Sequence, residues 1–201
     1  MINIRIVLSS STKGCQKAYD LKVSVLEAFC YTHIMNLEYP YQLTAFIDNE
    51  PEIGEPVYYG KNDWYPQIAL KRRFKTVGIS EDELVEMIST YCKSKTPFFV
   101  QTGRLTKPDS MPVKVLEVKD INDYLINLHN DFISFMGDII LSRYPARDGA
   151  HYLPHVTAEY KGEMVIDDQK FADKSFEINR IFLLKDVQDE NSIAYKSFDL
   201  T

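Results

Sequence analysis

Hydrophobic and polar residues alternate along some parts of this chain and recur at helical spacing along others. Short alternating or continuous apolar runs predict strands, whereas stripes that repeat every three or four residues predict helices. The expected strands cover residues 2–9, 43–47, 64–74, 97–105, 113–118, 153–160, 176–184 and 193–200. The expected helices cover residues 14–31, 80–93 and 120–136. Strands and helices mixed in this way, with short turns between them, indicate an α+β fold.

Polar residues mark where the two later helices begin. Ser80 stands three residues before Glu83, which is the spacing of a capping box, and Asp120 is expected to cap the helix that follows it. The last two strands are expected to form a hairpin around residues 186–192. The buried stripe of the 120–136 helix is expected to consist of Leu125, Leu128, Phe132 and Phe135.

The strand at residues 153–160 carries a pair of side chains suited to phosphate chemistry. Strand side chains alternate between faces, so His155 and Thr157 project from one face and Val156 from the other. An imidazole can move a proton, and a hydroxyl can donate a hydrogen bond to a phosphoryl oxygen. This pair is therefore a candidate catalytic half-site.

A second segment of the chain repeats this layout. Tyr65-Pro66-Gln67-Ile68-Ala69-Leu70 matches Leu153-Pro154-His155-Val156-Thr157-Ala158 in its order of apolar, Pro, polar, β-branched and small residues. The two polar positions are 155 − 67 = 88 residues apart, close to half of the chain. Two similar strands in two halves indicate a duplicated fold with a cleft between the copies.

With these two segments the sequence resembles the 2H phosphoesterase superfamily, and within it the bacterial proteins called 2′-5′ RNA ligase-like. The family motif is a pair of His-x-Thr or His-x-Ser strands that face each other across a groove. The resemblance covers most of the chain, from about Asn3 to Leu200. It implies one domain, residues 1–201, with two pseudo-symmetric lobes. Each lobe is expected to contain an antiparallel sheet with flanking helices beside a central cleft, and the motif strands lie near residues 64–74 and 153–160.

The resemblance also assigns roles to individual residues. It implies that His155 is catalytic and that Thr157 binds the phosphate. In the first motif Gln67 stands where the family has His, and Ala69 stands where it has Thr or Ser. Gln67 therefore takes only the position of the missing histidine, and we expect it to face His155 across the cleft. Ala69 takes over no chemistry at all.

Candidate substrate-binding residues surround the two motifs. The basic run from Lys71 to Lys75 directly follows the first one, and strand alternation places Lys71 and Arg73 on the face of Gln67. We expect both cations to bind phosphate. An aromatic side chain is expected at the edge of the cleft, where a base could stack on it. His151 is expected to line the cleft. The aromatic candidates are Tyr58, Tyr59, Trp64 and Tyr65.

The remaining histidines and the cysteines do not predict a metal site. His33 is expected at a helix end and His129 on the polar face of its helix. Cys15, Cys30 and Cys92 lack the spacing of zinc ligands and do not indicate a disulfide framework, which is typical of the reducing cytoplasm. We predict neither a metal nor a cofactor. P-loop, dinucleotide-binding and nucleophile-elbow motifs are absent from the sequence.

Composition limits the possible partners. The net charge of −6 argues against a protein that coats a long nucleic-acid duplex, since such binding depends on neutralising phosphates. A small nucleotide or an RNA end, bound by a few local cations, remains compatible with this charge. No apolar run approaches the roughly 20 residues of a membrane-spanning helix. We therefore expect a cytoplasmic protein without a membrane partner.

Two functions remain open at this point. The first is a phosphodiesterase of reduced or specialised activity, in which His155 is the only motif histidine. A substrate hydroxyl, a water or a tyrosine such as Tyr58, Tyr59 or Tyr65 then performs the second step. The second is a catalytically inactive module that binds a nucleotide or RNA in the same cleft. The replacements at Gln67 and Ala69 favour the binding module, whereas the complete half-site at His155 and Thr157 favours the enzyme.

Overall fold

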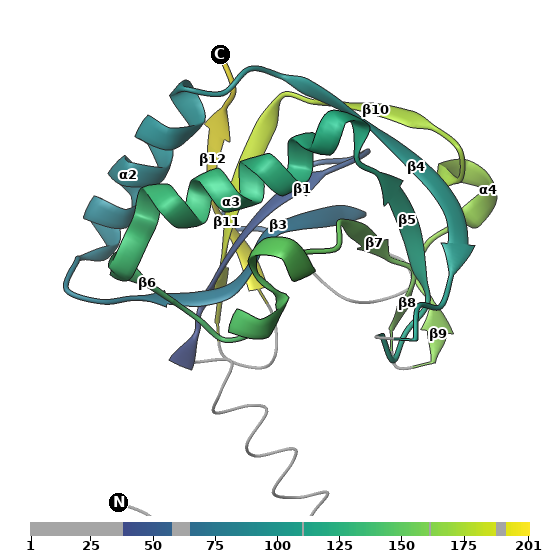
Figure 1. Cartoon of the computed structure of the whole chain (residues 1–201), viewed down its shortest axis with the longest axis horizontal. Helices are drawn as coiled ribbons and strands as arrows, with labels where there is room; N and C mark the ends of the chain where they lie inside the picture. The colour runs from purple at the N-terminus through teal and green to yellow at the C-terminus, as the bar shows by residue number, and fades with distance from the viewer. Residues whose placement is uncertain (1–37, 58–64, 110, 161, 188–191) are drawn as a thin grey trace, which may run out of the picture. The chain divides into compact units, whose positions relative to one another are not determined.

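The computed structural model describes residues 38–57, 65–109, 111–160, 162–187 and 192–201, which are drawn in colour in Figure 1. All of them belong to one compact unit, residues 36–201. The expected strand at residues 2–9 and the helix at 14–31 lie outside the described residues. So do the following candidates from the sequence: Cys15, Cys30, His33, Tyr58, Tyr59 and Trp64.

The described residues form a long antiparallel sheet with helices packed on it. The strands are β1 (Tyr41–Phe46), β2 (Pro56–Val57), β3 (Gln67–Thr76), β4 (Phe98–Thr106), β5 (Val115–Lys119), β6 (Ile140–Ser142), β7 (His155–Thr157), β8 (Glu159–Tyr160), β9 (Glu163–Met164), β10 (Ser175–Ile178), β11 (Arg180–Asp186) and β12 (Ser192–Asp199). The α-helices are α2 (Glu81–Lys93), α3 (Tyr124–Met136) and α4 (Asp168–Phe171). Short 3₁₀ turns are η1 (Ile121–Asp123), η2 (Gly137–Ile139), η3 (Pro145–Arg147) and η4 (Gly149–His151).

Sheet topology confirms the α+β class with antiparallel strands. The described part of the large sheet has the order β10-β4-β5-β7-β3-β1-β11-β12-β2, with β6 paired to β3. The strands β8 and β9 form a small separate sheet. The two halves of the large sheet meet where Ile68 of β3 pairs with Val156 of β7, so they are hydrogen-bonded into one continuous sheet.

The main core lies between this sheet and the helices α2 and α3. Figure 1 shows α3 lying across the sheet with α2 beside it. Leu84 and Ile88 of α2 and Phe132 of α3 are buried against Ile68 and Phe74 of β3. A smaller apolar cluster consists of Phe46, Val57, Phe182, Leu184 and Ala194, with Tyr65 packed against it.

The expected helix start at Ser80 is confirmed, and Asp120 caps the next helix as expected, although that helix begins only at Tyr124. Ser80 accepts a hydrogen bond from the backbone N–H of Glu83, whose carboxylate accepts one from the N–H of Ser80, so the capping box is complete. The Asp120 carboxylate accepts hydrogen bonds from the N–H groups of Leu125 and Ile126, with nitrogen-to-oxygen distances of 2.7 and 2.9 Å. This carboxylate satisfies donors of the first turn of α3 across the intervening turn η1.

The buried stripe of α3 differs from the expected one at two positions. Leu125, Leu128 and Phe132 are buried as expected, but Phe135 is 42% exposed and His129 only 2% exposed. At 100° per residue, His129 falls about 40° from Leu125 around the helix, whereas Phe135 falls about 80° away. The expectation that His129 lies on a polar face was wrong. It is part of the face that packs on the sheet.

The expected strands at residues 153–160 and 176–184 are each divided. The first becomes β7 and β8, and the second becomes β10 and β11. The expected hairpin is confirmed for β11 and β12, which pair along their length. The segment β10 instead pairs with β4 at the far edge of the sheet.

Candidate functional site

The two motif-like segments lie side by side on the neighbouring strands β3 and β7. Ile68 and Val156 pair with each other, and both are fully buried in the main core. Residues that flank a strand position point to the opposite face. The polar positions of both motifs therefore share the face of the sheet that turns away from this core.

Extending the register of that pair by one residue in each direction defines the arrangement of the motif residues. Ala69 lies opposite His155, and Gln67 lies opposite Thr157. Gln67 and His155 are thus diagonal neighbours, a relation that separates Cα atoms by about 7–8 Å. The candidate half-site, His155 and Thr157, therefore lies beside the methyl group of Ala69 and the amide of Gln67 on the neighbouring strand.

A cavity of about 400 Å³ opens beside His155. The guanidinium groups of Arg72 and Arg147 give it positive charge, and the rings of Tyr144 and Tyr152 give it apolar walls. Such a combination of cations and rings is suited to an anion that carries a flat group. Its lining includes Arg72, Tyr144, Arg147, His151, Tyr152 and His155.

The imidazole of His155 has one nitrogen bound to the protein. Its Nδ1 lies 2.8 Å from the backbone carbonyl oxygen of Leu153. A carbonyl can only accept, so Nδ1 carries the proton and Nε2 keeps a lone pair. Burial, together with the charges of Arg72 and Arg147, lowers the pKa of His155 to about 4 against the opposing effect of the Leu153 carbonyl. At neutral pH this side chain is a base.

His129 also lines the cavity, but both of its ring nitrogens are bound to the protein. Its Nδ1 donates to the carbonyl of Leu70 at 2.7 Å, and its Nε2 accepts from the N–H of Gly149 at 3.3 Å. The ring stacks on Tyr152 with 4.1 Å between centroids. Burial lowers the pKa of His129, so the ring stays neutral and joins α3 to β3 and to the turn η4.

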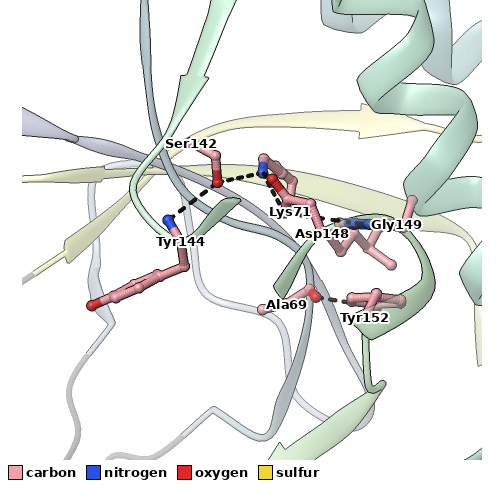
Figure 2. A network of polar contacts seen from close by, with 9 residues as sticks. Ala69, Lys71, Ser142, Tyr144, Asp148, Gly149 and Tyr152 are labelled. Carbon is pink, nitrogen blue, oxygen red and sulfur yellow. Dashed lines mark hydrogen bonds and ion pairs between the residues drawn. The ribbon is translucent and has the colours of Figure 1, made fainter. Parts of the chain in front are cut away.

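Lys71 is buried in an ion pair, as Figure 2 shows. Its side chain is 1% exposed, and its Nζ donates to both carboxylate oxygens of Asp148 at 2.6 Å and to the hydroxyl of Ser142 at 2.8 Å. Burial lowers the pKa of Lys71 while Asp148 opposes this effect. The ammonium group is thus bound within the protein, and Lys71 is not part of the cavity lining.

Two other expected binding residues point elsewhere. Arg73 forms an ion pair with Asp186, and it donates to Ser192 at 3.3 Å. The hydroxyl of Tyr65 donates to Glu55 at 2.5 Å, and this hydrogen bond lowers the pKa of Glu55. Neither Arg73 nor Tyr65 belongs to the lining of the cavity.

Two β-bulges change the faces of the side chains along β3. Leu43 and Thr44 of β1 pair with Lys71 and Ala69, so one extra residue lies between Ala69 and Lys71. A second extra residue lies between Lys71 and Phe74, which pair with Leu43 and Tyr41. Each bulge reverses the alternation of the side chains beyond it. The expectation that Lys71 shares the face of Gln67 and Ala69 was wrong for this reason.

Gln67 is fixed by its neighbours on β1. It is 6% exposed, and its side-chain oxygen lies 2.9 Å from the hydroxyl of Thr44 and 3.4 Å from the amide nitrogen of Gln42. The Thr44 hydroxyl also lies 2.9 Å from the carbonyl of Ile68. This buried amide holds a defined position at the level of Thr157, but it cannot exchange a proton near neutral pH.

The sequence did not single out Arg72, Tyr144 or Arg147 as candidate site residues. Arg72 belongs to the basic run whose neighbours Lys71 and Arg73 were selected, but these two form ion pairs with Asp148 and Asp186. Tyr144 and Arg147 lie in the loop before the motif strand, and the Arg147 guanidinium lies 5.7 Å from the centre of the Tyr144 ring. Loops beside a rigid strand often carry binding residues, which was the available signal.

Within the described ranges, no group of three or more His, Cys, Asp or Glu side chains could hold a metal ion. None of the helices in the same ranges is both long and apolar enough to span a membrane.

Comparison with known proteins supports the fold. No protein-family model and no curated protein sequence matches the chain. The chain is similar to a crystal structure of a phosphoesterase, with a TM-score of 0.53 and 13% identity over 81% of this chain and 98% of that one. E. coli LigT complexed with 3′-AMP gives a TM-score of 0.49, 15% identity, and coverage of 81% and 98%. TT0787 of Thermus thermophilus gives 0.47, 13%, and coverage of 80% and 97%. The chain has the fold of the phosphoesterase.

Proposed function

We propose that this protein is a 2H-type phosphoesterase that acts on a phosphodiester in a small nucleotide or an RNA end. The bond that it acts on is a 2′-5′ linkage, a 2′,3′-cyclic phosphate or a linkage of a cyclic oligonucleotide. One observation carries the proposal: His155, whose Nδ1 is bound to the carbonyl of Leu153, lines a cavity together with Arg72 and Arg147. The fold shared with a phosphoesterase agrees with it.

Arg72, Arg147 and His155 line the cavity, whereas Thr157 lies on β7 outside its lining. Guanidinium groups bind phosphate oxygens through charge-assisted hydrogen bonds, which assigns the phosphodiester to Arg72 and Arg147. Thr157 stands two residues after His155 on the same face of β7, where its hydroxyl can donate to a phosphoryl oxygen. His155 is the general base, since burial keeps its pKa low and the ring neutral.

The second candidate function is a nucleotide-binding module without turnover. One observation favours it: the residue opposite His155 is Ala69, and Gln67 is hydrogen-bonded to Thr44. The strand β3 therefore contributes no titratable side chain at the positions of the first motif. A cationic cavity with aromatic walls would still bind a nucleotide.

One assay separates these functions. The purified protein is incubated with 2′,3′-cyclic nucleotides, 2′-5′-linked dinucleotides and cyclic oligonucleotides, and product formation and binding are both measured. The variant His155→Ala should lose turnover by about 10²-fold or more. The exposed Gln169→Ala on α4, outside the cavity lining, is the matched control and should behave like the wild type.

The outcomes of this assay are distinct. Turnover that depends on His155 supports the enzyme. Tight binding without turnover of any substrate supports the binding module. A wild type that neither binds nor converts these compounds would overturn both functions and leave only the fold.

A further inference from the structure

We infer that His151 supplies the second acid–base group of the reaction, in place of the histidine missing from β3. This inference rests on the proposed phosphoesterase function. His151 and His155 line the same cavity although they enter it from different elements, the turn η4 and the strand β7. The catalytic pair then comes from one half of the chain instead of from two motif strands.

The other histidine of the cavity cannot take this part. Attack on a phosphodiester needs one group that accepts a proton and one that donates a proton to the leaving oxygen. Both nitrogens of His129 are already bound, to the carbonyl of Leu70 and the N–H of Gly149. The side chain of His151 is exposed and has no hydrogen bond or ion pair with any residue that the structure describes. As far as the described ranges go, both of its nitrogens are therefore open to a ligand.

The turn that carries His151 is fixed by the network in Figure 2. Asp148, directly before η4, accepts from the buried Lys71 at 2.6 Å, and the N–H of Gly149 donates to His129. After the turn, the hydroxyl of Tyr152 donates to the carbonyl of Ala69 at 3.1 Å. The backbone of His151 thus lies between residues that are bound to β3 and α3. An exposed side chain on a fixed backbone is suited to a catalytic group, because small displacements greatly reduce catalysis.

The surroundings of His151 and His155 assign them opposite tasks. His155 is partly buried, and its pKa of about 4, lowered first by burial, makes it a base at neutral pH. The side chain of His151 is exposed to solvent. Acid and base roles are commonly separated by contrasting environments of this kind.

The proposed hydrolysis balances with water as the co-reactant. The water oxygen attacks phosphorus while Nε2 of His155 takes one proton from the water. The bond between phosphorus and the leaving ribose oxygen breaks, and the imidazolium of His151 gives its proton to that oxygen. The products are a phosphomonoester and a hydroxyl group. Proton exchange with solvent then restores neutral His155 and protonated His151.

A change of leaving group tests the role of His151. The variants His151→Gln and His155→Gln are compared with wild type on a 2′,3′-cyclic nucleotide and on the p-nitrophenyl ester of a nucleoside 5′-phosphate. Nitrophenolate leaves without a proton, so its release does not need a general acid. His151→Gln should lose about 10²-fold or more in kcat on the cyclic nucleotide and less than about 10-fold on the ester. His155→Gln should lose activity on both.

Two further measurements distinguish catalysis from structure. The alkaline limb of the pH profile of kcat on the cyclic nucleotide should disappear in His151→Gln, which a structural role would not cause. The variant Ala150→Ser, at an exposed position of the same turn outside the cavity lining, should keep wild-type kinetics.

The results separate the inference from the function on which it rests. Equal losses of His151→Gln on both substrates, or no loss on either, overturn the role of His151 while the phosphoesterase function stands. A wild type without turnover of either substrate overturns the phosphoesterase function and this role together.

Discussion

Single residues of the site make the folded protein sensitive to acid. Burial lowers the pKa of His155 from the ordinary 6.5 to about 4, and burial also lowers the pKa of His129. Between pH 6.5 and 4 the unfolded chain therefore binds a proton at His155 that the folded protein does not bind. The free energy of unfolding should fall as the pH falls through this range, by on the order of 1–3 kcal/mol for His155.

Urea unfolding at pH 7.5 and at pH 4.5 measures this effect. The variant His155→Gln should lose less stability between these pH values than the wild type, because its side chain does not titrate. Equal losses in the two proteins would show that His155 is not responsible. A bound phosphate analogue should raise the pKa of His155 by adding negative charge, which NMR titration of the imidazole can detect.

The missing motif residues offer a second test at the same scale. Gln67→His combined with Ala69→Thr should create a second His-x-Thr motif, because these positions lie opposite Thr157 and His155. A new general acid or base is typically worth about 10²-fold or more in rate, so phosphodiesterase activity should rise by that order. Thr44, which already lies 2.9 Å from the Gln67 oxygen, is placed to orient the new imidazole.

Activity assays of the wild type, the double variant and both proteins with His155→Ala test this restoration. The His155→Ala change should abolish basal and restored activity alike. A double variant that binds nucleotide yet stays inactive would show that the spacing across β3 and β7 no longer supports a pair of histidines.

At the scale of elements, the sequence predicted what depends on local chemistry. The capping box at Ser80 and the cap at Asp120 were identified correctly because a helix start needs particular side chains at particular spacings. His155 and Thr157 share one face of β7 as expected, because strand alternation holds over three residues. Alternation failed along β3, since a bulge is fixed by its pairing with β1, which no local pattern reveals.

The burial of Lys71 has the same origin. Its partner Asp148 is 77 residues further along the chain, and only the folded structure brings the two together. A basic run beside a motif predicts phosphate binding, but one of its cations joins β3 to the turn η4 instead. Pairings between distant residues therefore decided which cations reach the cavity.

A double-mutant cycle tests the structural role of this ion pair. Lys71→Met leaves the Asp148 carboxylate without its cation, and Asp148→Asn leaves a buried ammonium without its anion. Each single change should lower the free energy of unfolding by roughly 3 kcal/mol, because breaking one partner of a buried pair exposes the full cost of burying the other. The double variant should be closer to wild type than either single variant.

The exposed pair of Lys170 and Asp48 is the matched control. Its Nζ to oxygen distance is also 2.6 Å, but the lysine side chain is 53% exposed. The corresponding changes Lys170→Met and Asp48→Asn should cost less than about 1 kcal/mol each, as expected for surface pairs. Additive losses at Lys71 and Asp148, measured by urea unfolding, would contradict the ion pair as the source of stability.

At the scale of the whole described unit, residues 36–201, the two halves of the sheet share one core. The backbone junction between β3 and β7 consists of one residue pair, Ile68 and Val156. The apolar cluster is far more extensive: it contains Phe98 of β4 and Val118 of β5 together with Leu183 of β11. Because buried apolar contacts dominate stability, the shared core rather than the backbone junction should determine how the unit unfolds.

We therefore predict that both halves open in a single cooperative transition. Native-state hydrogen exchange should give the amides of β4 and β5 the same opening free energy as those of β1 and β11, whereas amides of the small sheet β8–β9 should open at lower free energy.

A core variant tests the same point. Val156→Ala should lower the opening free energy in both halves equally, by about 1–3 kcal/mol, since this fully buried side chain packs in the shared core. The control is Glu177→Ala at an exposed position of β10, which should change the opening free energy of neither half by more than about 0.5 kcal/mol. If β4 and β5 exchange at a lower free energy than β1 and β11, the halves unfold separately, and the single-pair junction limits their cooperativity. An equal opening free energy in both halves would mean that the cavity and the neighbouring strands β3 and β7 are lost only when the whole unit unfolds.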